Sequence, residues 1–282
     1  MQDGVKLKST SLAKIFAVIL ITILVLLILF ILTFKLISSA ENLGVQYVNS
    51  FTDTADKVIN KHTTILESSA SNLSYFMKKN YSDEDVQGWM NNYIKYIKKT
   101  LNTTGIDVFG LVNGKLISGQ DRLGTVTMPI DEIRFYTEAL KHKGEIFYTE
   151  IYNDVVNHEK VFTLSMTLDK GKDVLAIDFF PKQLGTRWLL DMSLPKDASY
   201  FLTDAKGEII LLATSIKQPM ANFQAAMKTT ISKIYSGENQ YNSAYNYIID
   251  LEGKKRSLFY SFIHNNMVVV LTIPQTVLYK QA

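Results

Sequence analysis

Two aspartates stand where an acid is unusual, and their carboxylates are the groups best suited to chemistry in this chain. Asp178 closes the apolar stretch Val174–Ile177, so it is either buried with a partner or placed at the mouth of a pocket. Asp154 lies within residues 151–159, where it is either a ligand contact or a turn residue, because Asn and Asp favour turns. The chemistry open to both is binding, since a carboxylate accepts charge-assisted hydrogen bonds from a cation.

Other chemistries find no support in the sequence. The four histidines are scattered, with no pair at the helical spacing of metal ligands: His62, His142, His158 and His264. No serine or lysine stands in a recognisable nucleophile motif, and neither a Walker loop nor a GxGxxG sequence is present. The net charge of +3 is too small to indicate nucleic-acid binding. We therefore expect no catalysis, metal, cofactor or nucleic-acid partner.

The apolar run Ile15–Phe34 is long enough, as a helix, to cross the roughly 30 Å hydrocarbon core of a bilayer. Lys6, Lys8 and Lys14 precede it, which predicts a cytoplasmic N-terminus and an extracytoplasmic bulk of the chain. A cleaved signal peptide is the alternative, with 38–40 as a small-residue cleavage site. Its apolar core would span only about 7–15 residues, however, so we expect an uncleaved anchor in the plasma membrane.

The part outside the membrane is expected to be globular. Charged residues make up 20% of the chain, which argues against disorder. Cysteine is absent, so that part must be stabilised by packing and not by disulfides.

Helices are expected first. Apolar or small residues recur at spacings of three and four from Val48 to Met77, which predicts one long amphipathic helix that rises from the membrane. Residues 80–82 interrupt it, and Ser82 followed by three acids predicts the start of a second helix that continues to about Leu101.

Strands are expected from 106 to 273. Four turn pairs between apolar stretches predict β-hairpins: Asn113-Gly114, Lys170-Gly171, Lys206-Gly207 and Glu252-Gly253. Two helical stretches, 131–142 and 218–235, lie between them, so a hairpin, a helix and three strands occur twice. Met267–Pro274 is too short to cross a bilayer and is expected as the last strand. The fold class is therefore α+β, with one module used twice.

An anchor, a long ascending helix and two consecutive modules resemble the double Cache sensor domain. That domain is the extracytoplasmic ligand-binding region of bacterial chemoreceptors, sensor kinases and diguanylate cyclases. In its membrane-distal module the family shows an aromatic pair opening a helix with an alanine three residues on, then Tyr-x-Asp, then an aspartate closing the last strand. The matching residues here are Phe135-Tyr136 with Ala139, Tyr152-Asn153-Asp154, and Asp178. The resemblance covers about 40–273 and implies tandem PAS-like modules with antiparallel sheets.

The resemblance also implies a ligand site in the distal module. Asp154 and Asp178 would accept hydrogen bonds from a ligand ammonium, while Tyr136 and Tyr152 would fix its orientation. Carboxylates offset the desolvation of such a cation, and aromatic faces add about 0.5–2 kcal/mol of cation–π attraction. Phe135 is either part of this site or a core residue, since aromatic side chains on helix faces usually fill the core.

The chain departs from the amino-acid-binding pattern at one place. The arginine that clamps an α-carboxylate in the family falls at Ile133, whereas Arg134 stands one residue later. One helical residue is a rotation of about 100°, which would aim Arg134 off the pocket unless its long side chain folds back. Arg122 is a second possible clamp. An amine without a carboxylate, such as a biogenic or quaternary amine, is therefore an alternative to an amino acid.

The expected protein is a homodimeric sensor that acts on a cytoplasmic output domain or partner, with 43–77 as the shared lever. The stripe on that helix either pairs between copies or packs on its own sheets. A membrane-anchored scaffold without a ligand is the alternative function; an anchored hydrolase lacks any motif. Because the family continues into a second transmembrane helix, the chain is expected to be truncated; the alternative is a complete single-pass protein that reports to a separate partner. The expected segments are a tail (1–14), the anchor (15–35), two helices (36–101), a distal module (102–180), a proximal module (181–274) and the start of a further membrane-directed segment (275–282).

Overall fold

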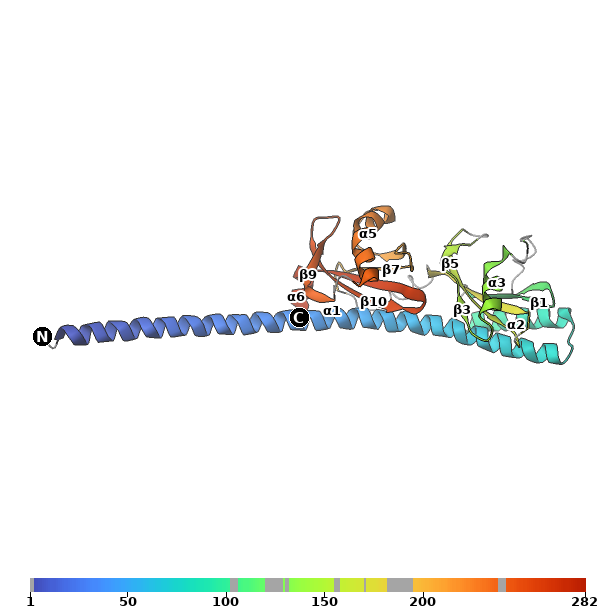
Figure 1. Cartoon of the computed structure of the whole chain (residues 1–282), viewed down its shortest axis with the longest axis horizontal. Coiled ribbons are helices and arrows are strands. Elements are labelled where there is room, and N and C mark those ends of the chain that lie inside the picture. The colour runs from blue at the N-terminus through green and yellow to red at the C-terminus, as the bar shows by residue number, and fades with distance from the viewer. Residues whose placement is uncertain are drawn as a thin grey trace.

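The structure is a computed structural model that describes residues 3–101, 106–119, 129, 132–154, 158–169, 171–181, 195–237 and 242–282. One helix of 76 residues, α1 (Asp3–Lys78), runs from the N-terminal end along both sheets. The sheets lie on the same side of α1, one after the other along its length (Figure 1). The expected fold class, an N-terminal apolar helix followed by two antiparallel α+β modules, is confirmed.

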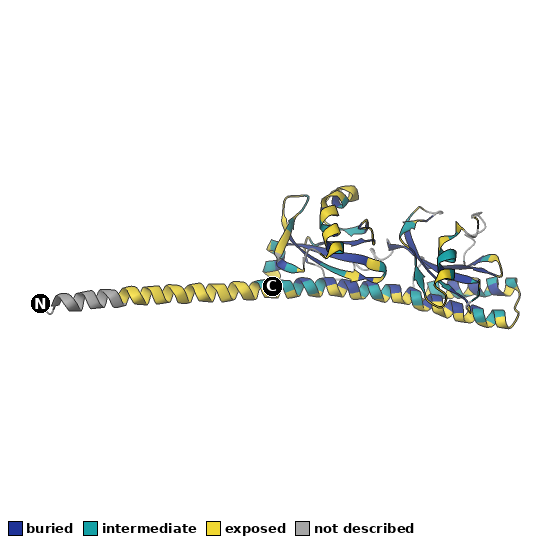
Figure 2. Cartoon of the chain, in the orientation of Figure 1, coloured by how far each residue is buried: buried dark blue, intermediate teal, exposed yellow. Residues whose placement is uncertain are grey.

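The N-terminal part of α1 has no partner among the described residues. All side chains from Lys14 to Leu36 are exposed, and an 18-residue window here has a mean hydropathy of 3.6 (Figure 2). The helix is long and apolar enough to cross a membrane, and exposure of so many apolar side chains is stable only in an apolar medium. This stretch suits a membrane anchor.

Beyond the anchor, α1 turns one stripe of side chains toward the two sheets. The buried apolar members of this stripe contribute to one continuous core: Ala40, Val48, Phe51, Ala55, Ile59, Ile65, Leu66, Ala70 and Leu73. The predicted amphipathic helix is thus present, and its stripe packs on sheets of the same chain.

The second helix, α2 (Asp83–Leu101), runs back along the distal module. Its start has a reciprocal cap: the backbone N–H of Asp85 donates to Ser82 Oγ, and the backbone N–H of Ser82 donates to the Asp85 carboxylate, both at 3.2 Å. Ser82 therefore begins this helix as the sequence predicted.

The distal module, which lies further along α1 from the apolar segment, contains a six-stranded antiparallel sheet. Its order is β2-β1-β6-β5-β3, with β4 also paired to β5. The short helix α3 (Arg134–Lys141) packs against β5 and β6. The strands are β1 (Asp107–Val112), β2 (Lys115–Ser118), β3 (Phe147–Tyr148), β4 (Tyr152–Asn153), β5 (Lys160–Thr167) and β6 (Val174–Phe179).

The proximal module repeats this order in five strands, β8-β7-β11-β10-β9. Helix α5 (Met220–Ser236) covers the face turned away from α1, and α6 (Gln275–Gln281) returns to α1, where Ser39 Oγ donates to the carbonyl of Ala282 at 3.1 Å. The strands are β7 (Ser199–Thr203), β8 (Ile209–Ala213), β9 (Ser243–Ile249), β10 (Lys255–Ile263) and β11 (Met267–Pro274), with the 3-10 turn η3 (His264–Asn266) before β11.

The strands of each predicted hairpin are paired, and Lys170 of the turn pair between β5 and β6 lies outside the described residues. Asn113 and Gly114 both have positive φ, as the tight turn after β1 requires. Two expectations were wrong in detail. The helix predicted at 131–142 begins only at Arg134, and the first module has four strands after it where three were expected. The reason is that β3 and β4 are separate short pairings along one strand, β5.

Candidate ligand-binding site

Polar side chains cross three neighbouring strands of the distal sheet in one row. Asp107 on β1 lies opposite Asp178 on β6, which lies opposite Thr163 on β5, and all three are buried. Phe109, two residues after Asp107, meets the ring of Phe135 from α3 at 5.0 Å. Side chains two residues apart share a face, so the row faces α3. We call Asp107, Asp178 and Thr163 the acid row.

A hydrogen-bond chain links one of the predicted tyrosines to one of the predicted acids. The Thr163 hydroxyl donates to Asp178 Oδ1 at 2.7 Å. Because its proton is used there, it accepts from the hydroxyl of Tyr152 at 2.5 Å. Tyr152 and Asp178, which are 26 positions apart in sequence, are thereby held together by a threonine that sequence reasoning had not selected.

Ser165 is a second polar residue that sequence reasoning missed. It stands two residues after Thr163 on β5, on the same face, opposite Ala176. Its hydroxyl is fully buried and has no hydrogen-bond partner among the described residues. Such a group costs about 1–3 kcal/mol unless something supplies a partner. A ligand beside the acid row would supply one.

Asp107 had a signal in the sequence that was overlooked. It opens an otherwise apolar strand in the same way that Asp178 closes one. Single-strand reasoning treats the two acids separately, and only the antiparallel register places them opposite each other. Within the described residues, no group of three His, Asp or Glu side chains could hold a metal ion. Two carboxylates and a hydroxyl suit N–H donors.

Asp154 follows β4 directly and is also buried. Its backbone closes a turn, because its N–H donates to the carbonyl of Glu159 at 2.8 Å and its carbonyl accepts from the N–H of His158 at 2.9 Å. The turn interpretation therefore describes its backbone. Its role as a ligand contact stays a prediction.

Phe135 and Tyr136 stand in the first turn of α3, and both are half-buried. The ring of Phe135 packs edge-to-face on Phe109, which favours the core-filling interpretation for this residue. The hydroxyl of Tyr136 makes no hydrogen bond with any described residue. The structure does not bring it to the acid row through a bond, so its ligand role also stays a prediction.

Arg134 forms an ion pair with Glu150, which is not a member of the acid row. Its Nη2 lies 3.5 Å from Glu150 Oε2, and about half of each side chain is exposed. The same carboxylate lies 2.9 Å from Nζ of Lys206, in the turn between β7 and β8 of the proximal module. The Lys206 ammonium, with Arg134 in support, lowers the pKa of Glu150 below its ordinary value, and Glu150 raises the pKa of Lys206. Arg122, the other predicted clamp, lies outside the described residues.

The proximal module carries a different group at the matching row. Ser199 on β7 lies opposite Thr272 on β11, which lies opposite Leu258 on β10. Arg256 is 2% exposed; its Nε donates to Thr272 Oγ1 at 3.2 Å and its Nη2 to Ser199 Oγ at 3.3 Å. Its Nη1 pairs with Asp250 Oδ2 at 3.0 Å. Burial lowers the pKa of Arg256, and Asp250 partly offsets that effect.

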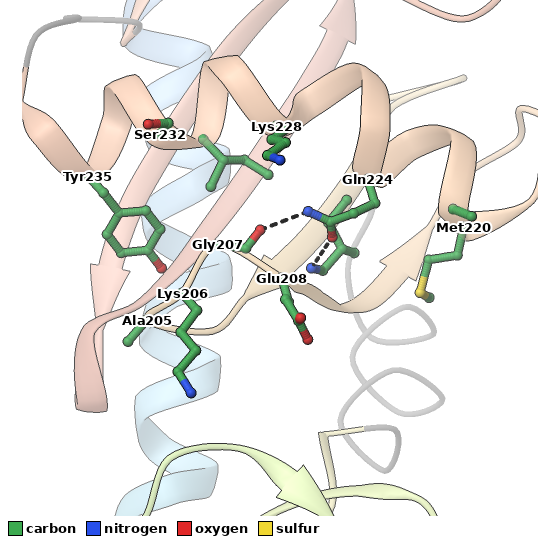
Figure 3. A pocket seen from close by; sticks show the side chains of 12 residues that line it. Ala205, Lys206, Gly207, Glu208, Met220, Gln224, Lys228, Ser232 and Tyr235 are labelled. Atoms are coloured by element: carbon green, nitrogen blue, oxygen red, sulfur yellow. Dashed lines mark hydrogen bonds between the residues drawn. The ribbon is translucent and has the colours of Figure 1, made fainter.

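A separate pocket of about 730 Å³ opens between α5 and the turn that joins β7 to β8 (Figure 3). Gln224 closes its floor, because its amide accepts from the N–H of Ile209 and donates to the carbonyl of Gly207. Tyr235 closes one end; burial raises its pKa to about 12. The lining is Ala205, Lys206, Gly207, Glu208, Ile209, Met220, Ala221, Gln224, Lys228, Ile231, Ser232 and Tyr235.

Strand β6 connects the acid row to α1. Phe179 follows Asp178 on β6 and points to the opposite face, where its ring meets that of His62 at 4.8 Å. His62 is buried in α1, and its Nδ1 lies 2.8 Å from the carbonyl of Val58. Strand β6 therefore carries Asp178 of the acid row on one face and, on the other face, Phe179 in contact with α1.

Known structures share this architecture. The ligand-binding domain of the Campylobacter jejuni chemoreceptor Tlp3 in complex with L-valine superposes with a TM-score of 0.59 at 18% identity, covering 86% of this chain and 96% of that one. The sensory domain of the same receptor reaches 0.61 at 19% identity, with 86% and 97% covered. The chain has the double Cache fold. The domain of the Pseudomonas fluorescens chemoreceptor CtaA with L-alanine agrees, at 0.57 and 16% identity, with 84% and 98% covered.

The double Cache fold rests on structure, because no family model matches the sequence and the comparison with curated proteins gave no match. Identities of 16–19% establish a shared fold and no shared ligand. The acid row belongs to the distal module, and the role of Asp178 as a ligand contact stays a prediction.

Proposed function

We propose that the chain is the extracytoplasmic sensor region of a bacterial transmembrane signal-transduction receptor. It binds a small amine-containing ligand, an amino acid or a biogenic or quaternary amine, in the distal module. The N-terminus lies in the cytoplasm, and the signal passes through the membrane to a cytoplasmic output domain or partner protein. No catalytic activity is part of this proposal.

The observation that carries the proposal is the hydrogen-bonded chain of the half-buried Tyr152 with the buried Thr163 and Asp178. Burying a carboxylate costs free energy unless a cation or several donors compensate it. An ammonium group supplies both the charge and three N–H donors. Ser165, buried beside the row without a described partner, offers a further contact.

Two of the similar structures hold ligands of this class. The Tlp3 domain was solved with L-valine and the CtaA domain with L-alanine, and both compounds carry an ammonium group. An α-carboxylate would meet a competitor in this chain, since Arg134 already pairs with Glu150. Amines that lack a carboxylate therefore belong in the ligand class beside the amino acids.

The route of the signal follows from the position of β6 between the acid row and α1. A ligand that pulls on Asp178 shifts the end of β6, and Phe179 at that end packs on His62 of α1. Only a ligand with different affinities for two states can drive such a shift, and the coupling is typically about 1–3 kcal/mol. Because α1 continues without a break to the apolar segment, its displacement reaches the membrane.

We propose a homodimer as the working unit. The apolar stripe of α1 packs on the chain's own sheets, so a two-fold contact would use the remaining, more polar side of the helix.

The test is a thermal-unfolding screen of the full chain in neutral detergent micelles, with proteinogenic amino acids, biogenic amines and quaternary ammonium compounds as probes. A ligand at a hundred times its dissociation constant stabilises the folded state by about 2.7 kcal/mol, which raises the midpoint measurably. Asp178→Asn and Tyr152→Phe should abolish or weaken the shift. Asp53→Asn, which changes an exposed acid on α1, is the matched control and should keep it.

A folded wild-type protein that responds to no probe would overturn the sensor proposal and favour the membrane-anchored scaffold. In that case Asp178→Ala should lower the unfolding midpoint without any effect on binding, because Thr163 would lose its acceptor for a purely structural reason.

A further inference from the structure

The edge of the proximal module that lies toward the apolar segment of α1 carries a small exposed patch. Strand β9, at the end of its sheet, and helix α6 are the elements of this module nearest to that segment (Figure 1). Tyr247 and Ile249 on β9 are 46% and 56% exposed, although both side chains are large and mainly apolar. Lys255 on β10 lies opposite Ile249, and its Nζ is 4.4 Å from the centre of the Tyr247 ring. We call Tyr247, Ile249 and Lys255 the β9 patch.

The β9 patch belongs to the sheet face that packs on α1, yet α1 leaves it exposed. Tyr247 lies opposite Ser257, and Phe259, two residues further along β10, packs on α1 at Gly44. Residues two apart on a strand share a face. The register of β9 and β10 shifts between Ser257 and Leu258, and such irregularities bend a strand pair. The hairpin of β9 and β10 rises away from α1 in Figure 1, which turns this face toward the apolar segment.

The distance along α1 places the β9 patch at the height of lipid headgroups. Ser243, at the start of β9, donates to the carboxylate of Glu41 at 2.6 Å. From Phe34, where the apolar run ends, to Glu41 the helix rises by about 10 Å. The headgroup layer on each side of a bilayer is roughly 5–8 Å thick. Since β9 leaves α1 steeply, the strand runs along the expected bilayer surface, within reach of lysine and tyrosine side chains (Figure 1).

The charges around the β9 patch favour an anionic surface. The exposed lysines at this end of the chain are Lys35, Lys254, Lys255 and Lys280. The described acids near them already have partners: Glu41 accepts from Ser243, Glu252 pairs with Lys254, and Asp250 pairs with Arg256. Cations are therefore in excess where the proximal module approaches the apolar segment.

We propose that the β9 patch is a lipid-docking site, and that it rests on anionic phospholipid headgroups of the bilayer that holds the apolar segment. The Tyr247 ring and the Ile249 side chain enter the headgroup region, where aromatic residues concentrate in membrane proteins. The Lys255 ammonium pairs with lipid phosphate. Docking fixes the angle of the proximal module to the membrane. This inference rests on the membrane anchor of the proposed function and on no property of the ligand site.

The experiment measures whether anionic lipid shields the patch. The chain has no cysteine, so Ile249→Cys introduces a single thiol beside Tyr247 and Lys255. This variant of the full chain is inserted, one chain per disc, into nanodiscs of phosphatidylcholine or of phosphatidylcholine mixed with phosphatidylglycerol. The measured quantity is the rate of reaction with an uncharged polyethylene-glycol maleimide, which lipid charge neither attracts nor repels. We expect the rate to be lower by about fivefold or more in the discs with phosphatidylglycerol.

Three further variants identify the group responsible, and each changes an exposed residue. Lys255→Gln, added to Ile249→Cys, should return the rate with phosphatidylglycerol to the rate with phosphatidylcholine. Lys228→Gln changes a lysine of α5, the helix that covers the face turned away from α1, and as the matched control it should keep the shielding. Tyr96→Cys places the thiol on α2 of the distal module, where the rate should not depend on the lipid.

The outcomes separate this inference from the proposed function. Equal rates in the two lipids, or shielding that survives Lys255→Gln, would overturn the docking site and leave the sensor proposal intact. Shielding only in discs that hold two chains would overturn it in favour of a contact between β9 strands of two copies. A chain that does not insert into discs would overturn the anchor, and with it both proposals.

Discussion

Lys206 of the proximal module lies with its Nζ 2.9 Å from Glu150 Oε2 of the distal module, and this carboxylate also pairs with Arg134 of α3. Two further contacts between the modules are polar: Lys160 pairs with Glu208 at 3.5 Å, and the Asn265 side chain donates to the carbonyl of Thr149 at 2.8 Å. Polar interfaces of this kind permit relative motion of the parts they join.

Removing the central acid should loosen the modules. In Glu150→Gln both cations lose their partner, while overall stability changes little because the pairs are exposed. The chain has no cysteine, so two introduced cysteines, at Lys141 on α3 and Lys228 on α5, can carry spin labels alone. We expect the distribution of distances between the two labels, measured by pulsed electron paramagnetic resonance, to be broader in Glu150→Gln than in wild type. Wild type at about 1 M salt, where the screening length is about 3 Å, should move toward the variant.

The control is Glu252→Gln, which breaks the pair with Lys254 inside the proximal module. It should leave the distance distribution as in wild type. An unchanged distribution in Glu150→Gln would mean that packing on α1 alone fixes the modules.

His62 should make the fold sensitive to mild acid. Burial lowers the pKa of His62 below its ordinary value of 6.5, with the Val58 carbonyl acting in the opposite direction. As pH falls through 6.5, His62 becomes protonated in the unfolded chain. In the folded chain His62 stays neutral until the pH reaches its lower pKa. The free energy of unfolding therefore falls in that window, by at most about 1.4 kcal/mol per pH unit.

Unfolding midpoints measured between neutral pH and mild acid should drop more steeply for wild type than for His62→Phe, which keeps a ring against Phe179. Parallel pH profiles for the two proteins would show that His62 is not the group responsible.

The buried pair of Arg256 and Asp250 should be costly to break. Arg256→Met leaves the Asp250 carboxylate buried without its cation, and such changes cost about 3–5 kcal/mol. Replacing both residues, as Arg256→Met with Asp250→Asn, should recover part of the loss, because asparagine removes the unpaired charge and keeps an oxygen acceptor for the N–H groups of Glu252 and Lys254. Lys254→Met removes an exposed lysine nearby and serves as the control, with little change expected in thermal unfolding. A small loss of stability in Arg256→Met alone would show that the Asp250 carboxylate does not depend on Arg256 for its compensating charge.

Two glycines in helices should respond to alanine with opposite signs. Gly44 on α1 passes so close to β10 that a Cβ would overlap the ring of Phe259, which is fully buried. Gly88 on α2 has open space around it. Gly88→Ala should stabilise by about 0.5–1 kcal/mol through helix propensity. Gly44→Ala should destabilise despite the same gain, and a stabilised Gly44→Ala would show that α1 can move off the sheet at no cost.

Much of the fold was accessible from periodicity and turn chemistry. The apolar run, the helical stripe up to Met77, the Ser82 start of α2 and the hairpin at Asn113-Gly114 depend on neighbours in sequence, and each was found. Short pairings were not accessible, because β3 and β4 have two residues each and exist only through β5.

The candidate site divides in the same way. Asp178 and Tyr152 were selected from sequence, but Thr163, which joins them, was not, because its importance comes from lying opposite Asp178 in the register of β5 and β6. The sequence left open where the Arg134 side chain points. In the structure it pairs with Glu150, which also pairs with Lys206 of the proximal module.

By itself, the sequence determined a membrane-length helix, repeated hairpins in the rest of the chain and an absence of catalytic or metal motifs, since these depend on composition and local spacing. Tertiary structure alone decided that Asp107 lies opposite Asp178 and that the row is acidic in one module and holds Arg256 in the other. The physical reason is that strand register, which aligns residues distant in sequence, is set by the packing of both sheets on α1 and the helices that cover them.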